Sequence, residues 1–246
     1  MSPISLLDRT LPTPAENLAL DEALLHRAER AFSREEGVEG AEALRFWESP
    51  VHFAVLGVSR RLRADVDVEA CAREGVDVLR RASGGGTVLQ GPGCLNFALV
   101  LSLERRPELR DVTRSYSLIL GRLAAALALE GLTHQGTSDL ARGDFKVSGN
   151  AQKRTRRALL HHGTILHAFD IGRMAACLRE PEERPRYRAG RPHGAFVENL
   201  RLTAQDVKLR IAREWRAEPP AEPIEIPDLS ELLREKYLNR EWTERF

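Results

Sequence analysis

The chain has 246 residues and a formal net charge of +1 at pH 7, with hydrophobic residues at 42% and charged residues at 30%. Such values are typical of a globular protein with a sizeable core, and the balanced charge gives no reason to expect binding to nucleic acid or a membrane surface. No stretch approaches the roughly 18 apolar residues of a membrane span and residues 1–30 lack a secretory pattern, so we expect a cytoplasmic protein. Three scattered cysteines indicate neither a disulfide framework nor a metal knuckle.

Hydrophobic periodicity divides the first half of the chain into helices and short strands. Apolar residues recur at helical spacing after an acidic first turn, whereas alternating and aromatic runs are typical of strands. Gly75 follows the second helical stretch, as glycine often does at helix ends. The predicted elements are a helix over 17–32, two short strands within 41–58 joined near Pro50, a short helix ending at Gly75, a strand over 76–79 and a buried strand over 94–103.

The second half continues this mixture and adds two proline-rich segments. The predicted elements are a long helix within 109–132 that ends at Gly131, hairpin strands over 145–149 and 158–167 joined by an exposed basic segment, helices over 171–178 and 202–215, and a last amphipathic helix over 229–242. The proline-rich segments predict an irregular loop over 180–196 and a stiff linker over 216–227. Because strand pairs and helices interleave without regular βαβ alternation, we predict an α+β fold with a mixed, largely antiparallel central sheet flanked by helices.

Residues 79–97, LRRASGGGTVLQGPGCLNF, place two arginines before three consecutive glycines. No Gly-Lys-Ser or Gly-Lys-Thr follows, as a phosphate loop requires, and a strand follows where the dinucleotide pattern requires a helix. Consecutive glycines allow the backbone to lie flat against a ligand, and Arg80 and Arg81 add planar donors suited to a carboxylate or phosphate. Taken alone, the three glycines are more typical of a flexible hairpin turn with solvated arginines.

A second motif contains a lysine in a chain that otherwise uses arginine. Of 37 basic residues only four are lysine, so Lys146 at the head of KVSG indicates a chemical reason specific to lysine. His161 and His162 lie on the next predicted strand, where adjacent residues point to opposite faces. They are therefore unsuited to sharing a zinc ion, and the pair alone indicates one core histidine and one surface histidine.

Three ordered motifs, RRASGGG (80–86), KVSGNAQ (146–152) and HHGTIL (161–166), resemble the lipoate–protein ligase and lipoyl/octanoyl transferase family. The catalytic domain of that family is similar to biotin protein ligase. ENLALDEALL (16–25) and LREKYLNREW (233–242) resemble the first and last helices of the family's catalytic domain. The resemblance covers nearly the whole chain, and it implies one catalytic domain over 1–246, with 216–227 as a linker to the final helix and no C-terminal accessory domain.

The resemblance implies an enzyme that uses ATP and Mg²⁺ to convert lipoate, or octanoate, to an acyl-adenylate. The acyl group then passes to a lysine of a lipoyl carrier domain, in a 2-oxoacid dehydrogenase E2 component or a glycine cleavage H protein, and a separate accessory subunit is a further implied partner. Lys146 is the implied catalytic lysine, and Asp139 matches a position near phosphate and metal. The implied substrate or adenylate contacts are Arg80, Arg81, Ser83, Gly84, Gly85, Gly86, Thr87, Asp139, Ser148, Gly149, His162, Gly163 and Thr164.

A lysine suits this chemistry because charge gathers on the acyl carbonyl and on the phosphate in the transition state. The compact ammonium of Lys146 can stay near both oxygens, which a rigid guanidinium fork would manage less well.

Two other interpretations stay open at the level of sequence. Octanoyltransferases of the family take the acyl chain from acyl carrier protein through a cysteine thioester and need no ATP. Neither of their cysteine positions, before the lysine or after the histidine-glycine strand, holds a cysteine here. Cys94 is the one candidate nucleophile near the site, and packing is the more common role for such a thiol. The third interpretation is a non-catalytic module that binds lipoyl domains, with the arginines of 184–194 facing an acidic carrier surface.

The chain also departs from the family pattern at two places. Family ligases often carry a His-Asp pair and an Asn after the glycines, where this chain has Gln90, Gly91 and Cys94. The segment 57–61 reads GVSRR where family ligases have a GRxQN-like sequence. Substrate contacts at these positions therefore do not follow from the resemblance.

Overall fold

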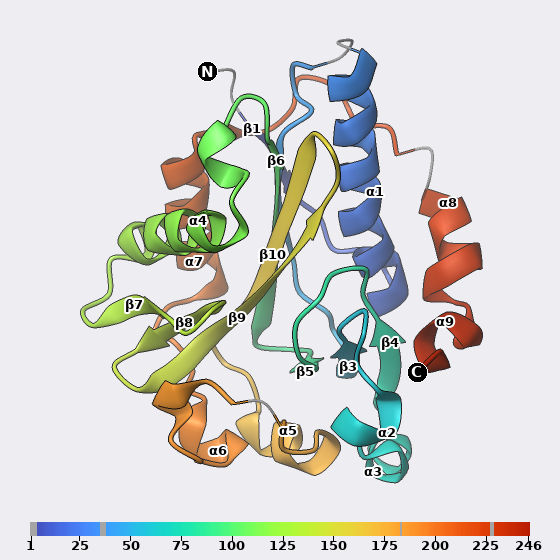
Figure 1. The fold of residues 1–246 in the computed structure, drawn as a ribbon, viewed down its shortest axis with the longest axis vertical. Helices are drawn as coiled ribbons and strands as arrows, with labels where there is room; N and C mark the ends of the chain where they lie inside the picture. The colour runs from blue at the N-terminus through green and yellow to red at the C-terminus, as the bar shows by residue number, and fades with distance from the viewer. Residues whose placement is uncertain (1–3, 35–37, 183, 227–228) are drawn as a thin grey trace.

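The computed structural model describes residues 4–34, 38–182, 184–226 and 229–246, and its main feature is an eight-stranded sheet (Figure 1). The strands are β1 (Ile4–Asp8), β2 (Ala43–Trp47), β6 (Cys94–Ser102), β7 (Leu132–Gln135), β8 (Asp139–Arg142), β9 (Phe145–Arg154), β10 (Ala158–Leu166) and β11 (Ala217–Glu218). Their order is β11-β1-β2-β6-β10-β9-β8-β7. β1 runs parallel to β11 and to β2, and the remaining pairs are antiparallel, which confirms the predicted mixed, largely antiparallel sheet.

A second, three-stranded sheet carries the glycine-rich loop. It consists of β3 (Phe53–Leu56), β4 (Asp77–Arg80) and β5 (Val88–Gln90), in the order β4-β3-β5. Residues 81–87 connect β4 to β5, so the loop leaves one edge strand of this small sheet and returns on the other. The small sheet therefore positions both ends of the loop.

The helices cover the two faces of the large sheet (Figure 1). The longer ones are α1 (Pro14–Arg34), α4 (Val112–Leu127) and α7 (Ala204–Trp215). The shorter helices and turns are α2 (Leu62–Asp65), α3 (Val68–Arg73), α5 (Ile171–Cys177), α6 (His193–Phe196), α8 (Leu229–Leu232) and α9 (Arg240–Glu244), with η1 (Pro107–Leu109), η2 (Arg186–Arg188) and the π-helical turn η3 (Leu233–Tyr237). Among the described residues, none of these helices combines the length and apolar character needed to cross a membrane.

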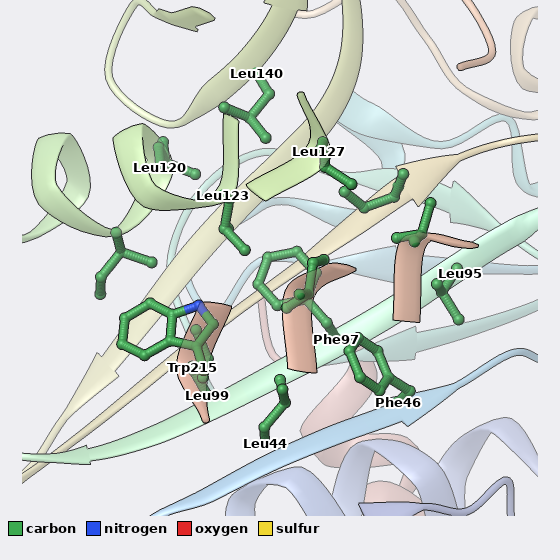
Figure 2. Packing of buried hydrophobic residues seen from close by; sticks show 14 of the residues in the cluster. Leu44, Phe46, Leu95, Phe97, Leu99, Leu120, Leu123, Leu127, Leu140 and Trp215 are labelled. Atoms are coloured by element: carbon green, nitrogen blue, oxygen red, sulfur yellow. The ribbon is translucent and has the colours of Figure 1, made fainter. Parts of the chain in front are cut away.

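Alternation along the strands divides the large sheet into two differently used faces. One face packs against α4 and α7: Leu44, Phe97 and Leu99 are fully buried there beside Leu123 (Figure 2). The opposite face packs against α1 in its upper part and against the small sheet near Trp47. Because α1 and the small sheet cover only part of this second face, a cavity can form over the rest.

Several details differ from the prediction. Helix α4 ends at Leu127, not at Gly131, because Ala128 adopts a left-handed conformation with φ of 50° and β7 begins at Leu132. The hairpin strand β9 runs on to Arg154, and thus takes in part of the predicted basic connection. The segment 180–196 contains η2 and α6 rather than irregular chain alone, and the linker 216–227 begins with β11, whose backbone pairs with β1.

The predicted last helix is broken into α8, η3 and α9. The π-helical turn brings two neighbouring side chains onto one carboxylate of α1: the Tyr237 hydroxyl donates to Glu22 at 2.8 Å, and the Lys236 ammonium lies 2.6 Å from it. Asn239 then caps α9 through its side-chain oxygen. Contacts to α1 therefore override the continuous amphipathic pattern.

His161 provides a pH-dependent contribution to stability. Its ring is fully buried between Phe97 and Tyr116, and burial lowers its pKa to about 3. In the unfolded chain the ring titrates near 6.5, so between these values the unfolded state binds the proton and the folded state does not. The contribution is complete above about pH 6.5 and decreases as the pH falls, by about 2 kcal/mol at pH 5.

We expect wild-type protein to lose about 2 kcal/mol more unfolding free energy between pH 7.5 and pH 5 than His161→Leu does, in urea titrations at both pH values. His134→Gln, on the edge strand β7, is the matched control and should keep the wild-type pH dependence. Equal pH dependence in wild type and His161→Leu would show that another group causes the loss.

Candidate active site

A cavity of about 620 Å³ lies between the second face of the large sheet and the glycine-rich loop. A row of lining residues crosses it from strand to strand: Trp47, Asn96 and Thr164 pair across β2, β6 and β10, and Gly149 pairs with Asp139 across β9 and β8. Neighbouring strands lie about 4.8 Å apart, so the four spacings in this row span roughly 19 Å. The cavity is therefore long enough for an extended ligand lying across the strands.

The two ends of the cavity differ in chemistry. Leu18, Trp47 and Val88 line one end and belong to a single apolar cluster. The other end lies under the segment 179–196, which supplies arginines beside Asp139 and Lys146. Over the whole lining, six Lys or Arg side chains stand against three Asp side chains, and Glu180 outside the lining pairs with Arg184 and Arg188. A modest positive excess remains, which suits an anionic ligand group. The charged side chains of the lining are Arg60, Arg81, Lys146, Arg179, Arg184 and Arg188 against Asp21, Asp65 and Asp139.

Lys146 lies at the charged end, and a β-bulge sets its direction. The register between β8 and β9 shifts at this point, so Lys146 pairs with Ala141 and turns toward the same face as Asp139. Its ammonium lies 2.7 Å from Asp139 Oδ1, and its side chain crosses directly over Gly149, where an added Cβ would be 3.0 Å from Nζ. The ammonium is thus held at the cavity with 27% of the side chain exposed.

Asp139 joins Lys146 to the arginine-rich segment. Its second oxygen, Oδ2, accepts a hydrogen bond of 2.8 Å from the Tyr187 hydroxyl on η2. Burial raises the pKa of Tyr187, and the Asp139 carboxylate raises it further, so Tyr187 stays a neutral donor at physiological pH. The segment 180–196 is thereby fixed over the charged end.

Asp139 is also the predicted metal ligand. Within the described ranges there is no group of three or more His, Cys, Asp or Glu side chains that could hold a metal ion by itself. Mg²⁺ usually binds one or two carboxylates together with substrate phosphates and water, so a single carboxylate at an arginine-rich end fits this ion. The metal would have to share Asp139 with Lys146 and Tyr187.

Arg81 shapes the glycine-rich loop from within. Its buried guanidinium donates to the carbonyls of Gly84 at 2.6 Å and Gly86 at 2.8 Å, and burial lowers its pKa to about 10. Gly85 adopts a positive φ of 85°, and its carbonyl lies so close to Gly57 that a Cβ on Gly57 would be 2.0 Å away. Glycine is therefore required at both positions for the loop to pack on its neighbouring segment.

His162 lies between Ser83, to which it is hydrogen-bonded, and the more distant carboxylate of Asp21. Its Nε2 lies 2.6 Å from Ser83 Oγ, and its Nδ1 lies 3.9 Å from Asp21 Oδ2. The order of groups is that of a serine–histidine–aspartate triad. However, Ser83 is 1% exposed, does not line the cavity and accepts a further hydrogen bond of 3.0 Å from Arg81 Nε. These contacts therefore position the His162 ring and the loop, and Ser83 does not face the cavity as a nucleophile would.

Asp21 is anchored by its other neighbours. The Arg45 guanidinium lies 2.5 Å from Asp21 Oδ1, and the Trp47 indole N–H donates to Oδ2 at 3.2 Å. Burial alone would raise the pKa of Asp21, but Arg45 and His162 together lower it below its usual value. Asp21 is therefore ionised, and its charge holds Trp47 in place at the apolar end.

The structure brings most of the predicted site residues to one cavity. Those that line it are Arg81, Gly85, Gly86, Thr87, Asp139, Lys146, Ser148, Gly149, His162, Gly163 and Thr164. Ser83 and Gly84 lie in the loop wall without lining the cavity. Arg80 points away from it and donates to backbone carbonyls, including those of Gly57 and Thr243.

The three cysteines are buried, and none of them lines the cavity. Cys94 is fully inaccessible at the start of β6, where burial and the nearby Glu48 raise its pKa to about 12. A thiol with so high a pKa is almost entirely protonated at neutral pH and is a poor nucleophile. The structure thus gives Cys94 a packing position.

Sequence reasoning missed several residues of the cavity, among them Asp21, Trp47 and Tyr187. A signal was present for Asp21, because it lies three residues after Leu18 and four before Leu25, on the apolar stripe of its helix. An acidic residue on a buried stripe needs a partner and is a candidate for a site. Tyr187 gave no such signal, since its role depends on how the segment 180–196 folds over β8.

Comparison with known proteins identifies the family. The "Lipoyl protein ligase A/B catalytic domain" family matches residues 13–215. The octanoyltransferase LipM of Carboxydothermus hydrogenoformans is 32% identical over 94% of this chain and 95% of that protein. A putative lipoate-protein ligase A of Aeropyrum pernix is 33% identical over 69% of this chain and 60% of that protein. A crystal structure of lipoate-protein ligase A bound with ATP superposes with a TM-score of 0.79 at 21% identity, over 99% of both chains, and so shares the fold.

The chain therefore belongs to the lipoyl protein ligase A/B catalytic domain family. It is an enzyme of the lipoate–protein ligase and octanoyltransferase group, as the three motifs predicted.

Proposed function

We propose that the protein is a lipoate–protein ligase that activates lipoate, or octanoate, with ATP and transfers the acyl group to a lysine of a lipoyl carrier domain. The observation that carries this proposal is the position of Lys146. Its ammonium lies where the apolar cavity meets the arginine-rich end, 2.7 Å from Asp139. An acyl chain in the apolar part and a nucleotide phosphate at the charged end would meet beside this lysine.

The reaction has two steps, each of which needs a cation at that meeting point. In the first, a carboxylate oxygen of lipoate attacks the α-phosphorus of ATP, and pyrophosphate leaves. In the second, the amine of the carrier lysine attacks the acyl carbonyl, AMP leaves and the amine loses a proton. Lys146 would stabilise the charge that develops on the phosphate oxygens in the first step and on the carbonyl oxygen in the second.

The remaining lining residues would bind and orient the two substrates. The glycine-rich loop, whose Gly84 and Gly86 carbonyls are bound by Arg81, would let a ligand approach its backbone closely. Arg179, Arg184 and Arg188 would supply positive charge for the phosphates, the last two while paired with Glu180. Asp139 would contribute one ligand to Mg²⁺. When bound, Mg²⁺ would neutralise phosphate charge. Holding both substrates in one cavity would supply a further part of the rate.

Acyl transfer from acyl carrier protein is the second candidate function, and the similarity to the octanoyltransferase LipM favours it. That reaction proceeds through a cysteine thioester in the family, so it requires a thiol at the acyl carbonyl. All three cysteines of this chain are buried and outside the cavity lining. This arrangement supports the ligase proposal over the transferase.

One assay with two acyl donors separates these functions. Apo lipoyl domain is incubated with the purified protein and either ATP, Mg²⁺ and lipoate, or octanoyl acyl carrier protein without ATP. We expect the mass of the carrier domain to increase by one lipoyl group in the first mixture alone, with release of pyrophosphate. Modification in the second mixture, lost in Cys94→Ser, would establish the transferase. Modification in neither would favour a non-catalytic binding module or a need for an accessory subunit.

A further inference from the structure

Gln90 lines the cavity and carries a buried polar atom without a partner in the described part of the chain. It is the last residue of β5 and is 6% exposed. Among the residues that the structure describes, its Oε1 atom has no hydrogen-bond partner. A buried carboxamide left without a partner is unfavourable, because it has lost its hydrogen bonds to water. A ligand in the cavity is the group that can restore one.

The strand pairing places Gln90 at the apolar end of the cavity. Gln90 lies directly opposite Phe53 in the antiparallel pair of β5 and β3, so the two side chains share a face. The Phe53 ring stacks on Trp47, with 6.2 Å between the ring centroids. Trp47 in turn lies on β2, four strands away from Asp139 in the cavity-crossing row. Gln90 would therefore face the tail of an extended acyl chain whose carboxyl group lay near Lys146.

The charged group at this end, the Asp21 carboxylate, already has its partners within the protein. Asp21 is held by Arg45 at 2.5 Å and by the Trp47 indole at 3.2 Å. Leu18 and Val88 offer no polar side-chain atoms, and the amide of Asn96, opposite Trp47 on β6, donates to Cys94 O at 3.4 Å. The tail of a bound ligand would thus meet a largely apolar surface in which the Gln90 oxygen is buried without a partner among the described residues.

We propose that Gln90 is a specificity-determining residue that makes the cavity select a lipoyl over an octanoyl group, an inference that rests on the proposed function. The lipoyl tail ends in a ring with two sulfur atoms, whereas the octanoyl tail ends in a methyl group. Rotation of the Gln90 carboxamide exchanges its oxygen and its NH₂ group. It can thereby donate to a sulfur of the oxidised ring or accept from a thiol of the reduced form, and a methyl group permits neither.

Binding of the free acids tests this inference without requiring catalysis. Lipoate and octanoate are titrated into the full-length protein by calorimetry, in the absence of ATP. We expect wild type to bind lipoate about fivefold more tightly than octanoate, the equivalent of one modest hydrogen bond. Gln90→Leu should reduce this ratio to about one, chiefly through tighter binding of octanoate, because the unpaired polar group is removed.

Two further variants control for misfolding and for the chemical change itself. Gln90→Met keeps the length of the side chain and should behave as Gln90→Leu does. Gln152→Leu makes the same substitution on β9, where the Gln152 amide contacts His161 on the opposite face of the sheet, and should keep the wild-type ratio. Equal affinity of wild type for the two acids, or a preference that persists in both Gln90 variants, would overturn the inference.

The outcome also separates this inference from the proposed function. A lipoate preference that depends on Gln90 in a protein that forms no acyl-adenylate would leave the inference standing and remove the ligase proposal. Formation of the acyl-adenylate, with a ratio of lipoate to octanoate affinity that does not depend on Gln90, would support the ligase proposal and remove the inference. Binding of neither acid would contradict both.

Discussion

Lys146→Ala is expected to lower the rate of carrier lipoylation by at least a factor of about 100 to 1000, the usual effect of losing one group that stabilises developing charge. The ammonium is the cation beside Asp139 at the point where the acyl chain and the nucleotide would meet. Because the apolar end does not contact this residue, the affinity for free lipoate should change much less than the rate. Single-turnover formation of the acyl-adenylate, followed by mass spectrometry of the carrier, measures the rate.

Two variants sharpen this prediction. Lys153→Ala removes another lysine of the same strand, outside the cavity lining, and should retain wild-type activity. Lys146→Arg keeps the positive charge but replaces the compact ammonium with a planar fork, and should recover only part of the lost rate. An active Lys146→Ala protein would mean that the reaction does not use this lysine.

Arg80→Leu is expected to lower the unfolding free energy by about 4 kcal/mol while leaving the cavity lining intact, because several buried carbonyls would lose a charged donor. The Arg80 guanidinium donates to Gly57 O at 2.9 Å, to Arg60 O at 2.6 Å and to Thr243 O at 2.7 Å. It therefore ties the segment before the glycine-rich loop to the carbonyl end of α9. Chemical denaturation measures the loss, and hydrogen exchange should show α9 opening first.

Arg63→Leu serves as the control for Arg80→Leu. Its side chain on α2 is 80% exposed, so the substitution should change stability by no more than about 0.5 kcal/mol. The sequence predicted that Arg80 contacts the substrate. A folded, fully stable Arg80→Leu protein with weakened nucleotide binding would support that role and contradict the structural one.

The order of the elements could be predicted from the sequence wherever a single local signal was strong. The helix around Leu18 and Leu25 and the buried run from Cys94 to Leu103 have clear periodicity or continuous apolar character, and both are confirmed as α1 and β6. The short strands β1, β7 and β8 were not predicted. They have four or five residues, and their pairing with distant strands decides their conformation.

The residues of the candidate site also fall into those that the sequence predicted and those that it did not. Lys146, Asp139 and the glycines were found because each lies in a motif that can be read along the chain, although their catalytic and binding roles stay predictions. The partners of these residues could not be found in this way. Tyr187 reaches Asp139 across 48 positions, and Arg45 reaches Asp21 across 24, so only the folded chain shows that these side chains meet.

The cavity-crossing row also bears on how acyl-chain length is selected. Because the cavity runs across the strands, each strand contacts a bound chain at its own position, about 4.8 Å from the position of the next strand. Trp47 on β2 lies at one end of this row of strands and Asp139 on β8 at the other. If the acyl chain lies along this row as proposed, a residue change on one strand alters the fit at one distance from the acyl carbonyl and leaves the contacts at other distances unchanged. Tail recognition and the chemistry at Lys146 could then evolve independently.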